Sequence, residues 1–245
     1  MKGIGLITLS TDPVGEHSFK AEMASYPVRV FTTRTSYDEA DHHAGGFIPI
    51  PDWPILLATL PPGDLVDLIA FACTSATIAL GNETLVNHLS SARSGLRYTS
   101  PGIASVTMMQ RFGIKRIALL TPYGPALHNK FAPYFASHGI QVIAAHSLSQ
   151  PMNLVTDDDV ARVPIERIQS ELEGLLDSTG PLDALFVSCA AFSIERRDLA
   201  RIGDILGHPV LASVNSMAWH SLDLLGEHSR RDELAAEIGL PRNET

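Results

Sequence analysis

The chain has 245 residues, of which 45% are hydrophobic and 18% are charged, a balance typical of a folded globular protein. Its formal net charge is -9, and no cluster of lysine and arginine marks a basic face, so we expect no nucleic-acid partner. No apolar run reaches the roughly 18 residues that a membrane-spanning helix needs, and the start of the chain reads as a strand, not as a signal peptide. We therefore expect no membrane partner and a cytoplasmic location.

Short apolar runs alternate with longer amphipathic stretches along the whole chain. The apolar runs predict strands over residues 3–9, 28–32, 65–72, 116–121, 141–145, 184–188 and 209–212. The amphipathic stretches predict helices over residues 54–60, 76–90, 103–112, 126–138, 164–177, 194–206 and 216–225. The runs are apolar nearly throughout, which is typical of parallel strands that are covered on both faces. The alternation predicts an α/β fold built from right-handed βαβ units.

The second half of the chain resembles the first. Residues 5–9 (GLITL) match residues 118–122 (ALLTP), and residues 67–73 (DLIAFAC) match residues 183–189 (DALFVSC). The first strand and the cysteine are similarly spaced in both halves, 65 residues apart (8 to 73) and 68 apart (121 to 189). We therefore expect two α/β/α halves related by a pseudo-twofold axis, with a cleft between them. Residues 1–100 plus 214–245 would form one half, and residues 101–213 the other.

Each half carries a cysteine at the carboxyl end of a predicted strand, where open α/β sheets bind ligands. In a reducing cytoplasm we expect Cys73 and Cys189 to stay free thiols. What looks like a helix start follows each of them, and a helix N-terminus lowers a thiol pKa and can bind a carboxylate. We expect Cys73 to be the more reactive thiolate, because residues with hydroxyl groups follow it. The alternatives are two buried, inert cysteines, or a disulfide if their Cα atoms lie within roughly 7 Å.

Other candidate substrate contacts lie at the same strand ends. They are Ser10, Thr11 and Asp12 after the first strand, Thr74 and Ser75 after Cys73, Tyr123 in the second half, and Ala190 after Cys189. The serine, threonine and aspartate side chains could instead serve only as turn or N-cap residues. Because the protein is acidic overall, an anionic substrate would need a local site of neutral donors.

The sequence does not predict a metal site. Two cysteines cannot form a structural zinc site by themselves, and the chain has no H-x-x-x-H or C-x-x-C pattern. His42 and His43 are adjacent, so their side chains would point apart on a strand or a helix. We therefore expect no metal.

The chain resembles the Asp/Glu racemase superfamily, in the branch of maleate cis-trans isomerases, arylmalonate decarboxylases and ectoine-utilisation proteins. The resemblance covers essentially the whole chain and is carried by residues 72–75 (ACTS) with Gly81, residues 120–123 (LTPY), residues 188–189 (SC) and residues 207–220. It implies two flavodoxin-like halves with parallel sheets, an active site in the cleft between them, and no cofactor. It also implies that Cys73 and Cys189 are the catalytic pair.

The resemblance further implies that Tyr123 and Asn153 bind the substrate. Residues 10–12 (STD) depart from maleate isomerases, which tend to have an asparagine there, and are closer to ectoine-utilisation proteins. Arylmalonate decarboxylases have glycine at the first cysteine position, so Cys73 argues against that activity. The substrate that we expect is a small carboxylate, and the chain could also form a homo-oligomer.

Two reactions are compatible with the cysteine pair. In a cis-trans isomerase acting on maleate or a similar cis-enedioate, Cys73 would add to the double bond and Cys189 would serve as acid and base. In a racemase or epimerase, one thiolate would remove an α-proton and the opposing thiol would return one to the other face. The second reaction would suit an amino acid, a hydantoin or an acylated diamino acid. A non-catalytic binding protein with the same two-lobed form is a third hypothesis.

Overall fold

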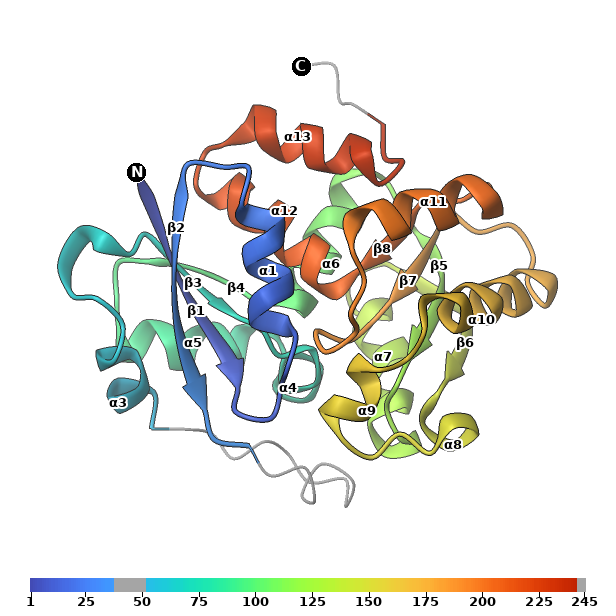
Figure 1. The fold of residues 1–245 in the computed structure, drawn as a ribbon, viewed down its shortest axis with the longest axis horizontal. Coiled ribbons are helices and arrows are strands. Elements are labelled where there is room, and N and C mark those ends of the chain that lie inside the picture. The colour runs from blue at the N-terminus through green and yellow to red at the C-terminus, as the bar shows by residue number, and fades with distance from the viewer. Residues whose placement is uncertain (38–51, 242–245) are drawn as a thin grey trace.

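The computed structural model describes residues 1–37 and 52–241. Two four-stranded sheets lie side by side in it (Figure 1), and all their strands are parallel. The first sheet, in the order β2-β1-β3-β4, is made of β1 (Lys2–Leu9), β2 (Val28–Thr35), β3 (Leu68–Phe71) and β4 (Arg97–Thr99). The second sheet, in the order β6-β5-β7-β8, is made of β5 (Arg116–Thr121), β6 (Gln141–Ser147), β7 (Ala184–Val187) and β8 (Val210–Ala212).

Helices connect the strands of both sheets. In the first part of the chain they are α1 (Gly15–Met23), α3 (Trp53–Ala58), the 3₁₀ turn η1 (Gly63–Leu65), α4 (Thr74–Leu80), α5 (Asn82–Ala92) and α6 (Pro101–Arg111). In the second part they are α7 (Pro125–Ala136), α8 (Ser149–Met152), α9 (Asp157–Ala161), α10 (Ile165–Asp177), α11 (Arg196–Leu206), α12 (Ser213–Leu224) and α13 (His228–Glu237). Within the two described ranges, none of these helices is long and apolar enough to cross a membrane.

The internal repeat is present down to the pairing of individual residues. Ile4 pairs with Leu68 in the first sheet, and Ile117 pairs with Ala184 at the equivalent place in the second. One residue before each cysteine, a backbone N–H donates across the sheet: from Ala72 to the carbonyl of Ile7 at 2.8 Å, and from Ser188 to that of Leu120 at 2.9 Å. The two cysteines therefore occupy equivalent positions at the carboxyl ends of equivalent strands. The expected fold of two similar α/β halves with parallel sheets is confirmed.

Two helices lie between the sheets and join the halves. Figure 1 shows α6 and α12 at the centre of the molecule, where they pack against each other. α12 also contacts α1, β3 and β4 of the first half, as well as β8, which directly precedes it. The division of the chain at residues 100 and 213 stays a prediction.

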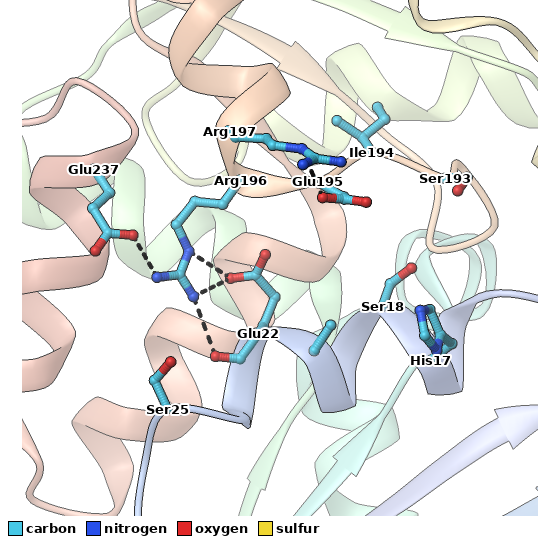
Figure 2. A pocket seen from close by; sticks show the side chains of 11 residues that line it. His17, Ser18, Glu22, Ser25, Ser193, Ile194, Glu195, Arg196, Arg197 and Glu237 are labelled. Carbon is cyan, nitrogen blue, oxygen red and sulfur yellow. Dashed lines mark hydrogen bonds and ion pairs between the residues drawn. The ribbon is translucent and has the colours of Figure 1, made fainter.

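A partly buried ion-pair network also ties the two halves together. Figure 2 shows the guanidinium of Arg196, at the start of α11, between the carboxylates of Glu22 in α1 and Glu237 in α13. Asn215 of α12 donates from Nδ2 to the other oxygen of Glu22 at 2.7 Å. Glu22 keeps only 7% of its surface exposed, so the loss of Arg196 would leave a buried carboxylate without its ion partner.

Several elements differ from the sequence-based prediction. The predicted helix over residues 76–90 is two helices, because Gly81 adopts φ 81°, a left-handed value that ends α4 before α5 begins. The strand predicted over 65–72 starts only at Leu68, since residues 63–65 form η1. α1, α8, α9, α13 and β4 were not predicted; they are short or mostly polar, so their apolar periodicity is weak.

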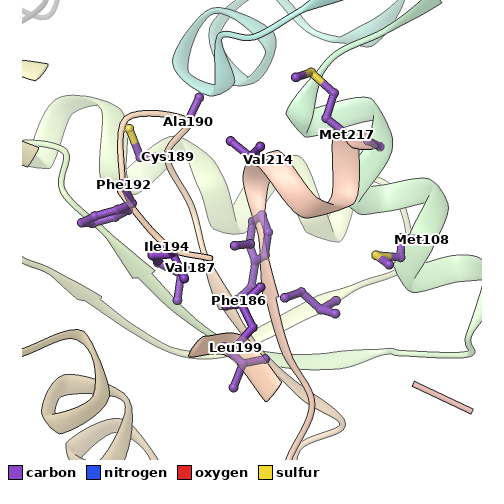
Figure 3. Packing of buried hydrophobic residues seen from close by; sticks show 14 of the residues in the cluster. Met108, Phe186, Val187, Cys189, Ala190, Phe192, Ile194, Leu199, Val214 and Met217 are labelled. Carbon is purple, nitrogen blue, oxygen red and sulfur yellow. The ribbon is translucent and has the colours of Figure 1, made fainter. Parts of the chain in front are cut away.

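Both cysteines are packed into the hydrophobic core. Figure 3 shows Phe186 and Val187 of β7 together with Val214 and Met217 of α12, and all four are buried members of the main hydrophobic cluster. Cys189 belongs to this main cluster, whereas Cys73 belongs to a smaller cluster under α3 and α5. Because each cysteine is anchored to a packed core, the backbone around both thiols is firmly positioned.

Candidate active site

Both cysteines line one small cavity, which we call the cysteine cavity. Its free volume is about 20 Å³, roughly the space that one water molecule occupies. Its lining side chains come from both halves and are Leu9, Asp12, Tyr37, Ala72, Cys73, Thr74, Ser75, Tyr123, Asp157, Cys189, Ala190 and Ala191. The fold therefore brings the two equivalent strand ends to a common site.

The Cys73 thiol is held at the start of α4. It is 3% exposed, its Sγ lies 3.2 Å from Oγ of Ser75, and the backbone N–H of Ala76 also donates to it. The pKa of Cys73 is raised to about 12, mainly by burial and to a smaller extent by the carboxylates of Asp157 and Asp12, against the lowering effect of the two hydrogen bonds. The expectation of a lowered pKa was wrong, because desolvation of a fully buried thiolate outweighs the helix N-terminus.

The Cys189 thiol lies in a loop and not at a helix start. The helix predicted over residues 194–206 is α11, which begins at Arg196, so this cysteine does not lie in the first turn of that helix. The backbone N–H of Ala191 donates to Sγ at 3.3 Å, and the Tyr123 hydroxyl donates to it as well. Burial, followed by the charge of Asp157, raises the pKa of Cys189 as well. Which of the two thiols is the more acidic stays a prediction.

The loop after β1 contributes one side chain to the cavity, Asp12, which is 2% exposed. Its Oδ1 accepts hydrogen bonds from the backbone N–H groups of Val14 (3.0 Å) and Gly15 (2.7 Å). A Cβ at Gly15 would lie 2.2 Å from Oδ2, so only glycine allows this close approach. Arg34 fixes the loop by donating to the backbone carbonyls of Leu9 and Asp12. Burial raises the pKa of Asp12.

Only some of the other predicted substrate contacts line the cysteine cavity. Thr74, Ser75, Tyr123 and Ala190 line the cysteine cavity, and the Thr74 hydroxyl donates to Oγ of Ser213 at 3.1 Å. Ser10 is exposed and does not line it. Thr11 does not line it either.

Asn153 is not brought to the cavity. It is exposed and ends α8 in the left-handed conformation, with φ 50°. The residues directly after it line a second small space beside the cysteine cavity, which we call the side cavity. Its lining residues are Tyr37, Pro122, Tyr123, Gly124, Leu154, Val155, Thr156, Asp157, Val160 and Cys189.

Sequence reasoning missed Asp157, which lines both cavities. Its Oδ2 accepts a 2.6 Å hydrogen bond from Oγ1 of Thr11, in the other half of the molecule. In the sequence it is the first of three aspartates that follow Thr156, a pattern that indicates only a helix N-terminus. The expected site of neutral donors is therefore corrected, because Asp12 and Asp157 put two carboxyl groups at the cavity.

A wider cleft of about 520 Å³ lies between α1 and α11, around the Glu22–Arg196–Glu237 network of Figure 2, and contains no cysteine. In the part of the chain that the structure describes, no group of three or more His, Cys, Asp or Glu side chains could hold a metal ion. His42 and His43 lie outside the described residues.

The raised thiol pKa values predict slow alkylation of the folded protein at neutral pH. Only the thiolate reacts, so below the pKa of about 12 for Cys73 the rate should rise about tenfold per pH unit, from about pH 7 to about pH 10. Limited iodoacetamide treatment followed by peptide mass spectrometry should modify Cys73 before Cys189. The urea-unfolded chain is the control, and equal rates for folded and unfolded protein near neutral pH would contradict the prediction.

The chain is similar to proteins of known activity. A family model described as arylmalonate decarboxylase matches residues 67–236. The maleate isomerase of Geobacillus stearothermophilus is 28% identical over 166 residues, which make up 65% of this chain and 64% of that relative. The aligned part thus spans less than two thirds of that relative's length.

Solved structures extend the similarity to nearly the whole chain. The maleate cis-trans isomerase of Nocardia farcinica bound to TRIS has a TM-score of 0.75 at 20% identity, covering 92% of this chain and 93% of that one. A cysteine-to-serine mutant of that enzyme, with a covalently bound succinylcysteine intermediate, has a TM-score of 0.73 at 18% identity and the same coverage. At such low identity, the likeness shows that the fold is shared.

Proposed function

Because this chain belongs to the arylmalonate decarboxylase family, we propose that it is a cofactor-independent isomerase whose Cys73 and Cys189 act on one small carboxylate substrate. The observation that carries the proposal is the pair of cysteines at equivalent strand ends, lining a single cavity. Decarboxylation is not the proposed reaction, since position 73 holds a cysteine where the resemblance expects glycine in decarboxylases. The reaction needs two reduced thiols, which suits the cytoplasmic location expected from the sequence.

In the proposed reaction, Cys73 adds to a carbon–carbon double bond next to a carboxylate. The S–C bond forms as the π bond breaks, and the electron pair moves to the neighbouring carbon, which Cys189 protonates. The remaining single bond rotates, Cys189 takes the proton back, and the double bond reforms as the Cys73 sulfur leaves. The covalent succinylcysteine intermediate of the Nocardia farcinica mutant supports this route.

The raised pKa values fit this sequence of steps. At neutral pH both thiols are mainly protonated, so Cys189 starts as a proton donor. Cys73 must lose its proton to solvent before it adds, and it regains a proton from solvent after its sulfur leaves. The Ser75 hydroxyl and the Ala76 N–H stabilise the thiolate that forms. The cavity is too small for a dicarboxylate in this conformation, so substrate entry requires its lining side chains to move apart.

Proton NMR in heavy water tests the proposal and separates its two reactions. Maleate, its monoamide (maleamate) and a panel of α-amino acids are incubated with the protein. Conversion of a cis to a trans alkene supports addition and rotation, whereas exchange of an α-proton supports racemisation by the same two thiols. The absence of both signals with every compound, in protein shown to be folded, would refute the proposal.

Tyr123→Phe should weaken substrate binding without disturbing the fold. The ring stacks on Phe131 with centroids 5.5 Å apart, and phenylalanine keeps that contact. The lost hydroxyl donates to Cys189 and, we propose, to the substrate carboxylate, so KM should rise about fivefold or more, corresponding to about 1 kcal/mol. Tyr134→Phe is the matched control, because that buried hydroxyl donates to Asn82 and does not line either cavity. Equal KM values in the two variants would remove Tyr123 from substrate binding.

A further inference from the structure

The charges around the two cavities are of one sign. Asp12 and Asp157 line the cysteine cavity, and no lysine, arginine or histidine of the described chain lines either cavity. Arg34 is close to Asp12, but its guanidinium is engaged by the carbonyls of Leu9 and Asp12 and by Glu16. A substrate with two carboxylates would therefore bring two negative charges to a site without an opposing cation among its described lining residues.

The lining of the side cavity has one charged residue among those that the structure describes, Asp157. It continues from the cysteine cavity past Tyr37, Tyr123 and Cys189, and the rest of its lining is mostly apolar. Asp157 is the only Asp, Glu, Lys, Arg or His among the described residues that line it. Its position is fixed from across the molecule, because Thr11 donates to its Oδ2 at 2.6 Å.

A substrate that spans both cavities has one end at each. At the cysteine cavity, the hydroxyl-bearing side chains of Thr74 and Ser75 line this end. Together with the Tyr123 hydroxyl, they suit a carboxylate. The other end of the substrate then enters the side cavity and meets the carboxylate of Asp157.

We propose that Asp157 selects a substrate whose second polar group is a nitrogen that donates hydrogen bonds, an amide or an ammonium, and not a second carboxylate. This inference rests on the proposed function, because it names the substrate class of the same site. An N–H donor makes a charge-assisted hydrogen bond with Asp157, whereas a carboxylate there is repelled and desolvated without a partner. Half-amides of cis-enedioic acids would keep the proposed addition and rotation unchanged.

Binding of unreactive probes tests the inference without requiring turnover. Succinate, its monoamide (succinamate) and 4-aminobutanoate share one carboxylate and differ at the other end, and calorimetry gives their Kd values. For the wild-type protein we expect succinamate or 4-aminobutanoate to bind at least about tenfold more tightly than succinate. Which of the two binds more tightly distinguishes an amide from an ammonium group.

Asp157→Asn provides the decisive comparison. Asparagine still accepts the hydrogen bond from Thr11 but carries no charge, so the preference over succinate should fall to less than about threefold. Asp158→Asn is the matched control, because this neighbouring aspartate lines neither cavity and pairs with Arg162 on the surface. It should keep the wild-type preference.

Three results would overturn the inference: tighter binding of succinate to the wild-type protein, an unchanged preference in Asp157→Asn, or no binding of any probe. The isomerase proposal is refuted by a different result from the one that refutes the role of Asp157. If the nitrogen-bearing probes bind as expected and none of maleate, maleamate and the amino acids is converted, the selectivity stands and the isomerase proposal falls. If maleate is turned over faster than maleamate, the isomerase stands and the role of Asp157 falls.

Discussion

Replacing Cys73 with serine should lower kcat/KM at least about hundredfold, the usual cost of losing an essential nucleophile or proton-transfer group. The substitution replaces the thiol sulfur with an oxygen and leaves the rest of the side chain unchanged. Cys73 is buried, and its Sγ lies 3.2 Å from the Ser75 hydroxyl, which a serine at position 73 can also reach. The fold should therefore survive, and the loss should lie in the chemical step.

The experiment measures turnover of the best substrate from the NMR panel, with circular dichroism and thermal unfolding of both proteins as the control for folding. A melting temperature close to that of the wild type, combined with lost activity, is the expected pair of results. Activity above about a tenth of the wild-type rate would show that Cys73 is not the nucleophile.

Replacing Cys189 with serine should also abolish turnover, but in this variant a covalent adduct on Cys73 should accumulate. Cys73 can still add to the double bond in this variant, whereas the serine hydroxyl is too weak a base to take the proton back. The adduct should therefore accumulate, as a covalent intermediate does in the cysteine-to-serine mutant of the Nocardia farcinica enzyme. The serine can still accept the hydrogen bonds from Ala191 and Tyr123.

Intact-protein mass spectrometry detects this adduct as a gain equal to the mass of one substrate. The assignment is unambiguous, because the chain has only two cysteines and one remains in the variant. The double variant, with serine at both positions, is the control and should show no gain. Lost turnover without an adduct, together with lost α-proton exchange, would favour racemisation over addition. Wild-type turnover would exclude Cys189 from the reaction.

The sequence by itself determined the architecture and the pair of thiols. The runs that became β1, β3, β5 and β7 are apolar nearly throughout, and strands buried on both faces must be so. The matched spacing of Thr8 with Cys73 and of Thr121 with Cys189 gave the repeat, which the strand registers reproduce. Such features are local or periodic, so they can be read without knowing which segments meet.

Only the tertiary structure decided the electrostatics of the site. Asp157 reaches Thr11 across 146 positions of sequence, and no local pattern distinguishes it from its neighbours Asp158 and Asp159. The fold also left Asn153 exposed, although it lies only a few residues from Asp157.

The direction of the thiol pKa shifts depended on the same tertiary context. A helix N-terminus beside Cys73 predicts a lower pKa, but the observed burial and the two carboxylates raise it to about 12. A pKa sums the effects of every group packed around the thiol and of the water that packing removes. Those neighbours come from both halves of the chain, so the sequence could place the two sulfurs at one site but could not set their charge state.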